Sequence, residues 1–193
     1  KAAEAADQIL AAHPRAAAAR ALKGIALARS GRLGDALKPL EVSAGTTTYI
    51  ELGGIGAHAD ALRAAGRGRE AWSLRAEHLN PLRPKGFRIK TQCNGIDDLL
   101  SVGDVDEAVH LGEEMVVEAP DSPAAHSFLA SALLEAGDAS GAEFHQWLAK
   151  RYSDRRIARI VVNEARLAMH YGDELAARRA WSRARVMRKR EPQ

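Results

Sequence analysis

The stretch AGDASGAEFHQ, at residues 136–146, decides the fold because its pattern recurs along the chain. In each copy a glycine is followed five residues later by an alanine. The other copies are SGRLGDALKPL (30–40), AGRGREAWSLR (65–75), VGDVDEAVHLG (102–112) and YGDELAARRAW (171–181). Neighbouring glycines are 35, 37, 34 and 35 residues apart, at Gly31, Gly66, Gly103, Gly137 and Gly172. A period near 34 residues is typical of stacked helical hairpins.

Small residues flank these glycines at fixed distances. Five residues after them come Ala36, Ala71, Ala108, Ala142 and Ala177. Seven before stand Gly24, Ala59, Ile96, Ala130 and Ala165, and four before stand Leu27, Leu62, Leu99, Leu133 and Ala168. Positions seven before and five after the glycine face each other across a hairpin, where small side chains let the two backbones approach closely. We expect each glycine to end the first helix of its hairpin.

The segments between the glycines have helical spacing. LKGIALA (22–28) and FLASALL (128–134) place apolar residues at i, i+3, i+4 and i+7, without the alternation of a strand. Pro14, Pro81 and Pro120 follow helical runs, and DSP at 121–123 has the cap residue and early proline that open a helix. The sequence therefore predicts an all-helical chain.

Nearly the whole chain resembles the tetratricopeptide repeat family. The family consensus has a small residue at place eight, glycine at fifteen, alanine at twenty and proline at thirty-two. Those places are held by Ala130, Gly137 and Ala142 in one repeat, and by Gly103, Ala108 and Pro120 in another. The resemblance implies an all-α fold in which antiparallel helical hairpins form a right-handed superhelix.

The register divides the chain into one solenoid with a partial repeat at its start. Ala2 takes the small position of a second helix and Pro14 its terminating proline, so we expect a fragment of a longer array. The second repeat diverges, with GGIGAHAD in its first helix and three extra residues around NPLRPKG, and we expect that helix to be shorter or bent. The predicted segments are 1–14 (second helix of a partial repeat), 15–48, 49–86 (divergent), 87–120, 121–154, and 155–193 (fifth repeat with a basic C-terminal helix).

Composition fits a folded protein without a disulfide. The chain has 193 residues, of which 46% are hydrophobic and 27% charged, a balance typical of soluble folded proteins. Only 5% are aromatic, so alanine-rich helix packing is expected rather than one deep core. The single cysteine, Cys93, fits a reducing compartment. We expect a cytoplasmic location, with the periplasm as the alternative.

No catalytic, cofactor or metal site is predicted. The chain has seven scattered histidines and no HExxH or HxH pair; they are His13, His58, His78, His110, His126, His145 and His170. His110 and Glu114 share a helix face but lack a third ligand. Cys93 has no nucleophile signature around it, and the GGIG at 53–56 follows no strand, so a close helix contact or a bend explains it better than phosphate binding. The chain is therefore not expected to be an enzyme.

The concave wall made by the first helices of the hairpins is the expected functional surface. Ile25, Cys93 and Ser131 also take inward-facing register places. The charged and polar residues expected to contact a partner there are Arg29, Asp60, Arg63, Lys90, Asp97, Glu135, Arg159, Arg166 and His170. A subset of the family clamps a C-terminal carboxylate with lysine, asparagine and arginine. This chain has Ala21, Ile25, Ala57, Lys90 and Asn94 at those places, so the clamp is missing.

The resemblance implies a non-catalytic scaffold that binds an extended segment or a helix of a partner protein. Because the alanine- and arginine-rich composition resembles proteins of high-GC bacteria, a secretion, envelope-assembly or regulatory complex is the expected setting. Most of the net charge of +3 comes from the end of the chain. The basic segment ELAARRAWSRARVMRKR (174–190) is the one place where membrane contact is expected, although a capping role is favoured.

Two other functions remain open. GDVDEAVHLGEEM (103–115) resembles the hairpin of pentatricopeptide repeats, which bind RNA with one base per repeat. Pro14, Pro120, the changing loop lengths and the lack of a recurring base-reading residue do not favour nucleic acid. Alternatively, the array targets an enzyme whose catalytic domain lies outside residues 1–193.

Overall fold

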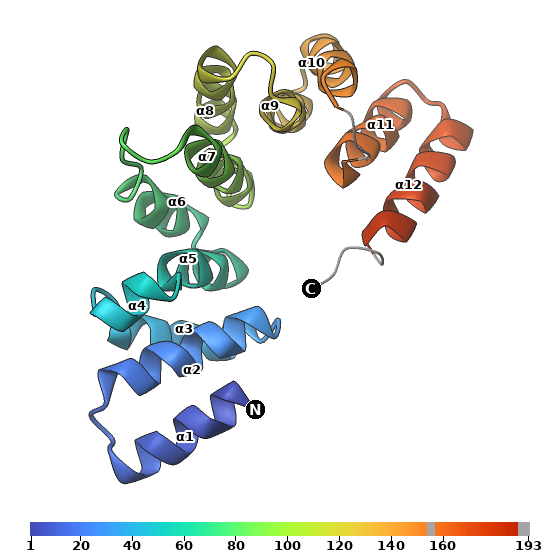
Figure 1. The fold of residues 1–193 in the computed structure, drawn as a ribbon. Coiled ribbons are helices and arrows are strands. Elements are labelled where there is room, and N and C mark those ends of the chain that lie inside the picture. Colours follow the sequence, from blue (N-terminus) through green and yellow to red (C-terminus); the bar gives the residue numbers. More distant parts are fainter. Residues whose placement is uncertain (154–156, 189–193) are drawn as a thin grey trace. The chain divides into compact units, whose positions relative to one another are not determined.

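The computed structural model describes residues 1–153 and 157–188, which divide into compact units at residues 80 and 81. Every regular element in the described ranges is a helix, so the all-α prediction is confirmed (Figure 1). Unit 1 contains α1 (Ala2–Ala12), α2 (Ala17–Arg29), α3 (Leu33–Ser43), α4 (Thr47–Glu51), α5 (Gly54–Ala64) and α6 (Gly68–Ala76). Unit 2 contains α7 (Lys85–Leu100), α8 (Val105–Glu118), α9 (Pro123–Glu135), α10 (Ala139–Arg151), α11 (Ala158–His170) and α12 (Glu174–Arg188).

Two of the expected features reach beyond the described residues. The division between the fourth and fifth repeats, at 154 and 155, lies outside them, as do residues 189 and 190 of the basic segment. No helix in the described ranges combines the length and the apolar character needed to span a bilayer.

The five repeated glycines end the first helices of the hairpins, as predicted. Their φ angles lie between 75° and 83°, a left-handed backbone that glycine adopts without steric cost. The amide of the residue after each glycine donates to the carbonyl of the residue four places before the glycine. Examples are the bonds from Arg32 to Leu27 (3.0 Å) and from Asp138 to Leu133 (2.9 Å). This bond and the one from the glycine amide form a Schellman cap. The position four before the glycine therefore contributes a capping carbonyl as well as a side chain.

The predicted small positions lie where the two helices of each hairpin touch. The five alanines after the glycines are at most 1% exposed, and so are the alanines at the facing places. At Gly24, an added Cβ atom would lie 2.6 Å from Cγ of Leu40, closer than packed carbons approach. Backbone proximity, rather than large side chains, thus builds much of this interior.

The divergent repeat begins with a short helix, α4, that the periodic pattern did not predict. The Thr46 hydroxyl caps it by accepting the amide of Tyr49 at 3.3 Å. Gly53 takes a φ of 77°, and Gly54 begins α5 against Tyr49, whose backbone oxygen would lie 2.6 Å from any Cβ there. The GGIG segment is therefore a helix start with a close helix contact. Helix α5, which begins at Gly54, has 11 residues, whereas α7 has 16.

The loop between α6 and α7 contains most of the predicted extra segment NPLRPKG, and the boundary between the two units falls inside it. Within unit 2, the first helices α7, α9 and α11 line one edge while α8, α10 and α12 lie outside them (Figure 1). Packing follows the same order, since α9 contacts both α7 and α11. The three first helices thus form a continuous layer.

Candidate functional site: the inner wall of unit 2

The inner wall is the layer of α7, α9 and α11, and its central contact joins the first of these helices to the last. Nη2 of Arg159, near the start of α11, donates to Oδ2 of Asp97 on α7 at 2.7 Å. The same guanidinium lies over the ring of Phe128 on α9, 3.9 Å from its centroid, and Nη1 reaches the Ser131 hydroxyl at 3.5 Å. Asp97 and Arg159 are each 29% exposed at the side chain, so the pair faces solvent in part.

A buried amide below this contact fixes α9 against α11. Asn163 is fully buried, and its Nδ2 donates to the backbone carbonyl of Ser127 at 2.8 Å. Its Oδ1 accepts the Ser131 hydroxyl at 2.9 Å. Since buried polar groups are costly without partners, these bonds set the spacing of the two helices and so the position of Arg159.

A second ion pair continues the wall toward the other end of the same helices. Nη2 of Arg166 on α11 lies 2.6 Å from Oε1 of Glu135 on α9. Lys90 on α7 and His170 on α11 are exposed, and the His170 ring contacts Tyr171 edge to face. The wall therefore presents charges of both signs, some already paired within the chain. Such a surface can bind a segment by exchanging these partners for the carboxylates, carbonyls or amides of another protein.

The expected partner-binding residues of unit 1 are engaged in contacts within that unit. Arg29 donates to the carbonyl of Leu52 at 2.9 Å, which ties α2 to the end of α4. Asp60 accepts from Arg63 at 3.4 Å and from Arg75 at 2.5 Å. Arg75 comes from the second helix, α6, and is only 4% exposed. These charges hold unit 1 together, and its wall offers fewer exposed groups than that of unit 2.

Three inward register places are filled by buried side chains. Ile25 is 2% exposed, Ser131 1% and Cys93 6%. Burial raises the pKa of the Cys93 thiol to about 12, and its Sγ lies 3.7 Å from Sδ of Met115. A thiol that stays protonated at neutral pH is a poor nucleophile, so Cys93 packs rather than reacts.

Several of the histidines contact other aromatic or histidine side chains, and one lies beside an acid. His126 and His145 face each other through their Nδ1 atoms at 2.9 Å, and His58 is joined to the Tyr49 hydroxyl at 3.0 Å. His110 and Glu114 lie 3.4 Å apart on one helix face, as expected. Among the described residues, no group of three or more histidine, cysteine or acidic side chains could hold a metal ion.

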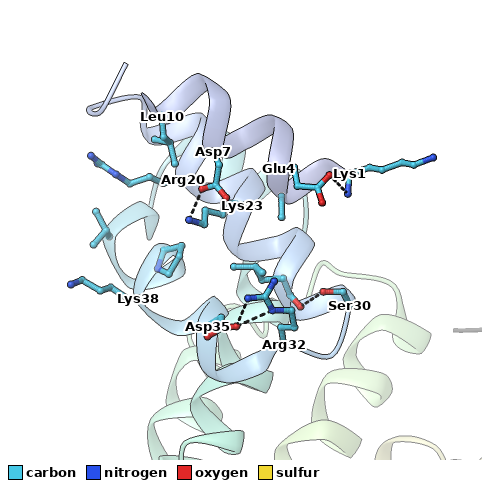
Figure 2. Close-up of a pocket in the computed structure, with 14 residues that line it drawn as sticks. Lys1, Glu4, Asp7, Leu10, Arg20, Lys23, Ser30, Arg32, Asp35 and Lys38 are labelled. Atoms are coloured by element: carbon cyan, nitrogen blue, oxygen red, sulfur yellow. Dashed lines mark hydrogen bonds and ion pairs between the residues drawn. The ribbon is translucent and has the colours of Figure 1, made fainter. Parts of the chain in front are cut away.

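A cavity of about 670 Å³ lies between α1 and the α2–α3 hairpin. Figure 2 shows that charged side chains from all three helices line it, and that one pair, Lys23 with Asp7, joins α2 to α1. Nζ of Lys23 lies 2.6 Å from Asp7, and Arg32 lies 2.6 Å from Asp35. The pair of Lys23 with Asp7 thus ties α1 to α2 beside this cavity.

The sequence did not predict three residues that hold the walls of the two units in place: Phe128, Asn163 and Arg75. Phe128 and Asn163 occupy the same helices as predicted residues but different register places, and their partners are 31 and 36 residues distant in sequence. Arg75 stands on a second helix, where the register predicts no inward charge. The one available signal was the polar residue Asn163 directly after the apolar run at 160–162.

A tetratricopeptide repeat model matches residues 99–145, which run from the end of α7 through α8 and α9 into α10. This segment is similar to tetratricopeptide repeats. A search of curated protein sequences finds no match.

Solved structures of other repeat proteins have the same fold. PilF of Pseudomonas aeruginosa is 15% identical, with a TM-score of 0.58 over 96% of this chain and 82% of PilF. MamA of Desulfovibrio magneticus is 16% identical, with a TM-score of 0.57 over 88% of this chain and 93% of that one. PilW, described as a type IV pilus biogenesis factor, is 14% identical, with a TM-score of 0.58 over 96% and 84% of the two chains. At such identities the likeness establishes the fold alone.

Proposed function

We propose that this tetratricopeptide-repeat chain is a non-catalytic scaffold whose inner wall on α7, α9 and α11 holds an extended segment or a helix of a partner protein. The observation that carries the proposal is the contact between Asp97 and Arg159, 62 residues apart in sequence. It joins alternate first helices across α9, so three hairpins contribute to one surface. A surface built from several repeats suits a ligand that runs along it.

Arg159 is the residue best suited to hold such a segment. Stacking on Phe128 fixes the plane of its guanidinium, and the bonds to Asp97 and Ser131 use only part of its five N–H donors. A fixed, planar guanidinium pairs well with a carboxylate or a backbone carbonyl. Arg166, 28% exposed beside Glu135, supplies a second cation on the same helix. We therefore expect the bound segment to carry at least one acidic residue.

A bacterial assembly is the setting that we propose for this scaffold, in secretion, in building the envelope or in regulation. The likeness to PilW, a type IV pilus biogenesis factor by its description, supports this setting without naming a partner. We propose a cytoplasmic location, with the periplasm as the alternative, since the buried thiol of Cys93 is compatible with both.

Selection of binders from a displayed library of random peptides tests the protein-binding role. The library is passed over the intact chain and then over a variant with Arg159→Glu and Arg166→Glu. We expect enriched peptides whose affinity falls by at least about tenfold in the variant, a loss of about 1.4 kcal/mol. The control is Lys38→Glu, an exposed charge reversal in unit 1 that should leave binding unchanged.

One result of this selection would contradict the role of the inner wall. If the peptides bound the double variant as tightly as the original chain, the binding surface would lie elsewhere. Salt-dependent binding of a random RNA pool near physiological ionic strength, lost in the same variant, would instead support the RNA-binding alternative.

A further inference from the structure

The outward face of α8 in unit 2 is an exposed acidic surface. Its exposed residues at spacings of i, i+4, i+7 and i+11 are Asp106, His110, Glu113 and Val117, with Glu114 beside them. Val117 is 83% exposed. The helix as a whole has five acidic residues and neither lysine nor arginine. We call this set of five exposed residues the acidic face.

The outward face of α12 has the opposite charge. Its exposed residues include Leu175, Arg178, Arg179, Arg185 and Val186, and the helix contains five arginines and one glutamate. Leu175 and Val186 are 59% and 50% exposed, so apolar groups stand among the guanidinium groups. We call this set of five residues the basic face.

Many charges on the two faces are not neutralised within the chain. In the described residues, Asp106 and Glu113 form no ion pair, and neither do Arg179 and Arg185. Arg178 reaches Glu174 at 3.3 Å, but both side chains are more than three-quarters exposed, so water screens that pair. The faces therefore retain charge for another molecule.

We propose that the basic face of one copy docks on the acidic face of a second copy. The two faces are complementary in charge, and each has exposed aliphatic groups that would be covered. Within one chain they cannot satisfy each other, because α8 packs on α7 and α9 whereas α12 packs on α11. Since different surfaces meet, each added copy leaves one face of each kind open. Association is thus head to tail, and it produces an open series of oligomers.

Sedimentation of the whole chain at concentrations up to about 300 µM tests the docking. In about 0.05 M salt we expect an average mass that rises with concentration past that of a dimer. In about 0.5 M salt the Debye length falls from roughly 14 Å to roughly 4 Å, so association should weaken by at least about tenfold. A chain that stays monomeric in low salt, or that associates equally in both salts, would overturn the proposal.

Complementary variants identify the faces. Arg179→Glu with Arg185→Glu reverses the basic face, and Asp106→Lys with Glu113→Lys reverses the acidic face. Each variant alone should lose self-association by at least about tenfold. An equal mixture should associate again, because the two intact faces are complementary in charge and so are the two reversed ones. A mixture that stays monomeric, or a variant that polymerises like the original, contradicts the assignment.

A matched control separates specific docking from net charge. Arg15→Glu with Lys38→Glu, both exposed in unit 1, changes net charge as much as the basic-face variant does. It should self-associate like the original chain; a tenfold loss here would mean that overall charge, not the basic face, drives association. Because all reversed residues are exposed, helical circular dichroism and urea midpoints should be unchanged, which excludes misfolding as the cause.

Discussion

Single residues decide how closely the helices of each hairpin approach. Gly24 on α2 lies against Leu40 of α3, which is fully buried and has no room to move aside. By contrast, Gly34 near the start of α3 has nothing within 4 Å of a Cβ. The two glycines therefore respond in opposite ways to one added methyl group.

Gly24→Ala should destabilise the chain. Overpacking of about 1–3 kcal/mol outweighs the gain of up to about 1 kcal/mol in helix propensity. Gly34→Ala is the matched control and should gain about 0.5–1 kcal/mol. Urea unfolding followed by circular dichroism measures both; a Gly24→Ala chain as stable as the original would show that the contact is loose.

A pair of histidines in unit 2 should make stability depend on pH. Nε2 of His126 lies 2.8 Å from the carbonyl of Pro120, which can only accept, so this nitrogen carries the proton. Neutral His126 then accepts at Nδ1 from Nδ1 of His145. Burial lowers the pKa of His145, and His126 lowers it further, whereas Glu113 and Asp138 act in the opposite direction.

The lowered pKa of His145 determines how the stability of the fold changes with pH. The unfolded chain takes up a proton on His145 near pH 6.5, before the folded chain does, so stability is fully present above that pH and is lost as pH falls below it. Urea midpoints measured between pH 7.5 and 5.5 should fall more steeply for the original chain than for His145→Gln. His13→Gln, at an exposed histidine, should behave like the original. If the urea midpoint fell equally with pH in the original chain and in both variants, the neutral pairing of His145 with His126 would be contradicted.

Residues that recur with the period could be predicted from the sequence, and those with individual partners could not. The turn glycines and facing alanines repeat because each hairpin meets the same steric limit. Arg159 was expected on the wall, but its stacking on Phe128 depends on one particular contact between α11 and α9. The pair of the buried Arg75 with the partly exposed Asp60 likewise depends on one particular helix contact.

Among the elements, α9 and α11 are joined by the buried amide of Asn163. Asn163→Ala removes one hydrogen-bond partner of the Ser127 carbonyl and one of the Ser131 hydroxyl, and leaves a small void. We expect a loss of about 1–3 kcal/mol in urea unfolding. Gln8→Ala, at an exposed position of α1, should change stability by less than about 0.5 kcal/mol. If Asn163→Ala lowered stability as little as Gln8→Ala does, water would be replacing the hydrogen bonds of Asn163.

The elements that break the period are the ones that the pattern missed. Helix α4 has only five residues and a single buried side chain, Tyr49, so no periodic signal marks it. The divergence of the second repeat was visible in GGIG and in NPLRPKG, but its form depends on the left-handed backbone at Gly53 and on Tyr49 packing over Gly54. Both are local tertiary contacts.

In unit 2, partner binding and self-association are assigned to separate surfaces, so they should be independent. Arg159→Glu with Arg166→Glu should reduce peptide affinity and leave the sedimentation series unchanged. Arg179→Glu with Arg185→Glu should do the reverse. Measuring both properties on both variants checks this, and a variant that loses both would indicate one shared surface or a general loss of structure.

Photo-crosslinking from the inner wall tests the central claim most directly. A photoreactive residue in place of Lys90, which is exposed on α7, should form adducts with a protein partner in the cells of origin, and Arg159→Glu should abolish them. The same group in place of Lys38, exposed on α3 of unit 1, should form none of these adducts. Adducts of equal yield from both positions, or adducts that survive Arg159→Glu, would contradict the assignment of the inner wall as the protein-binding surface.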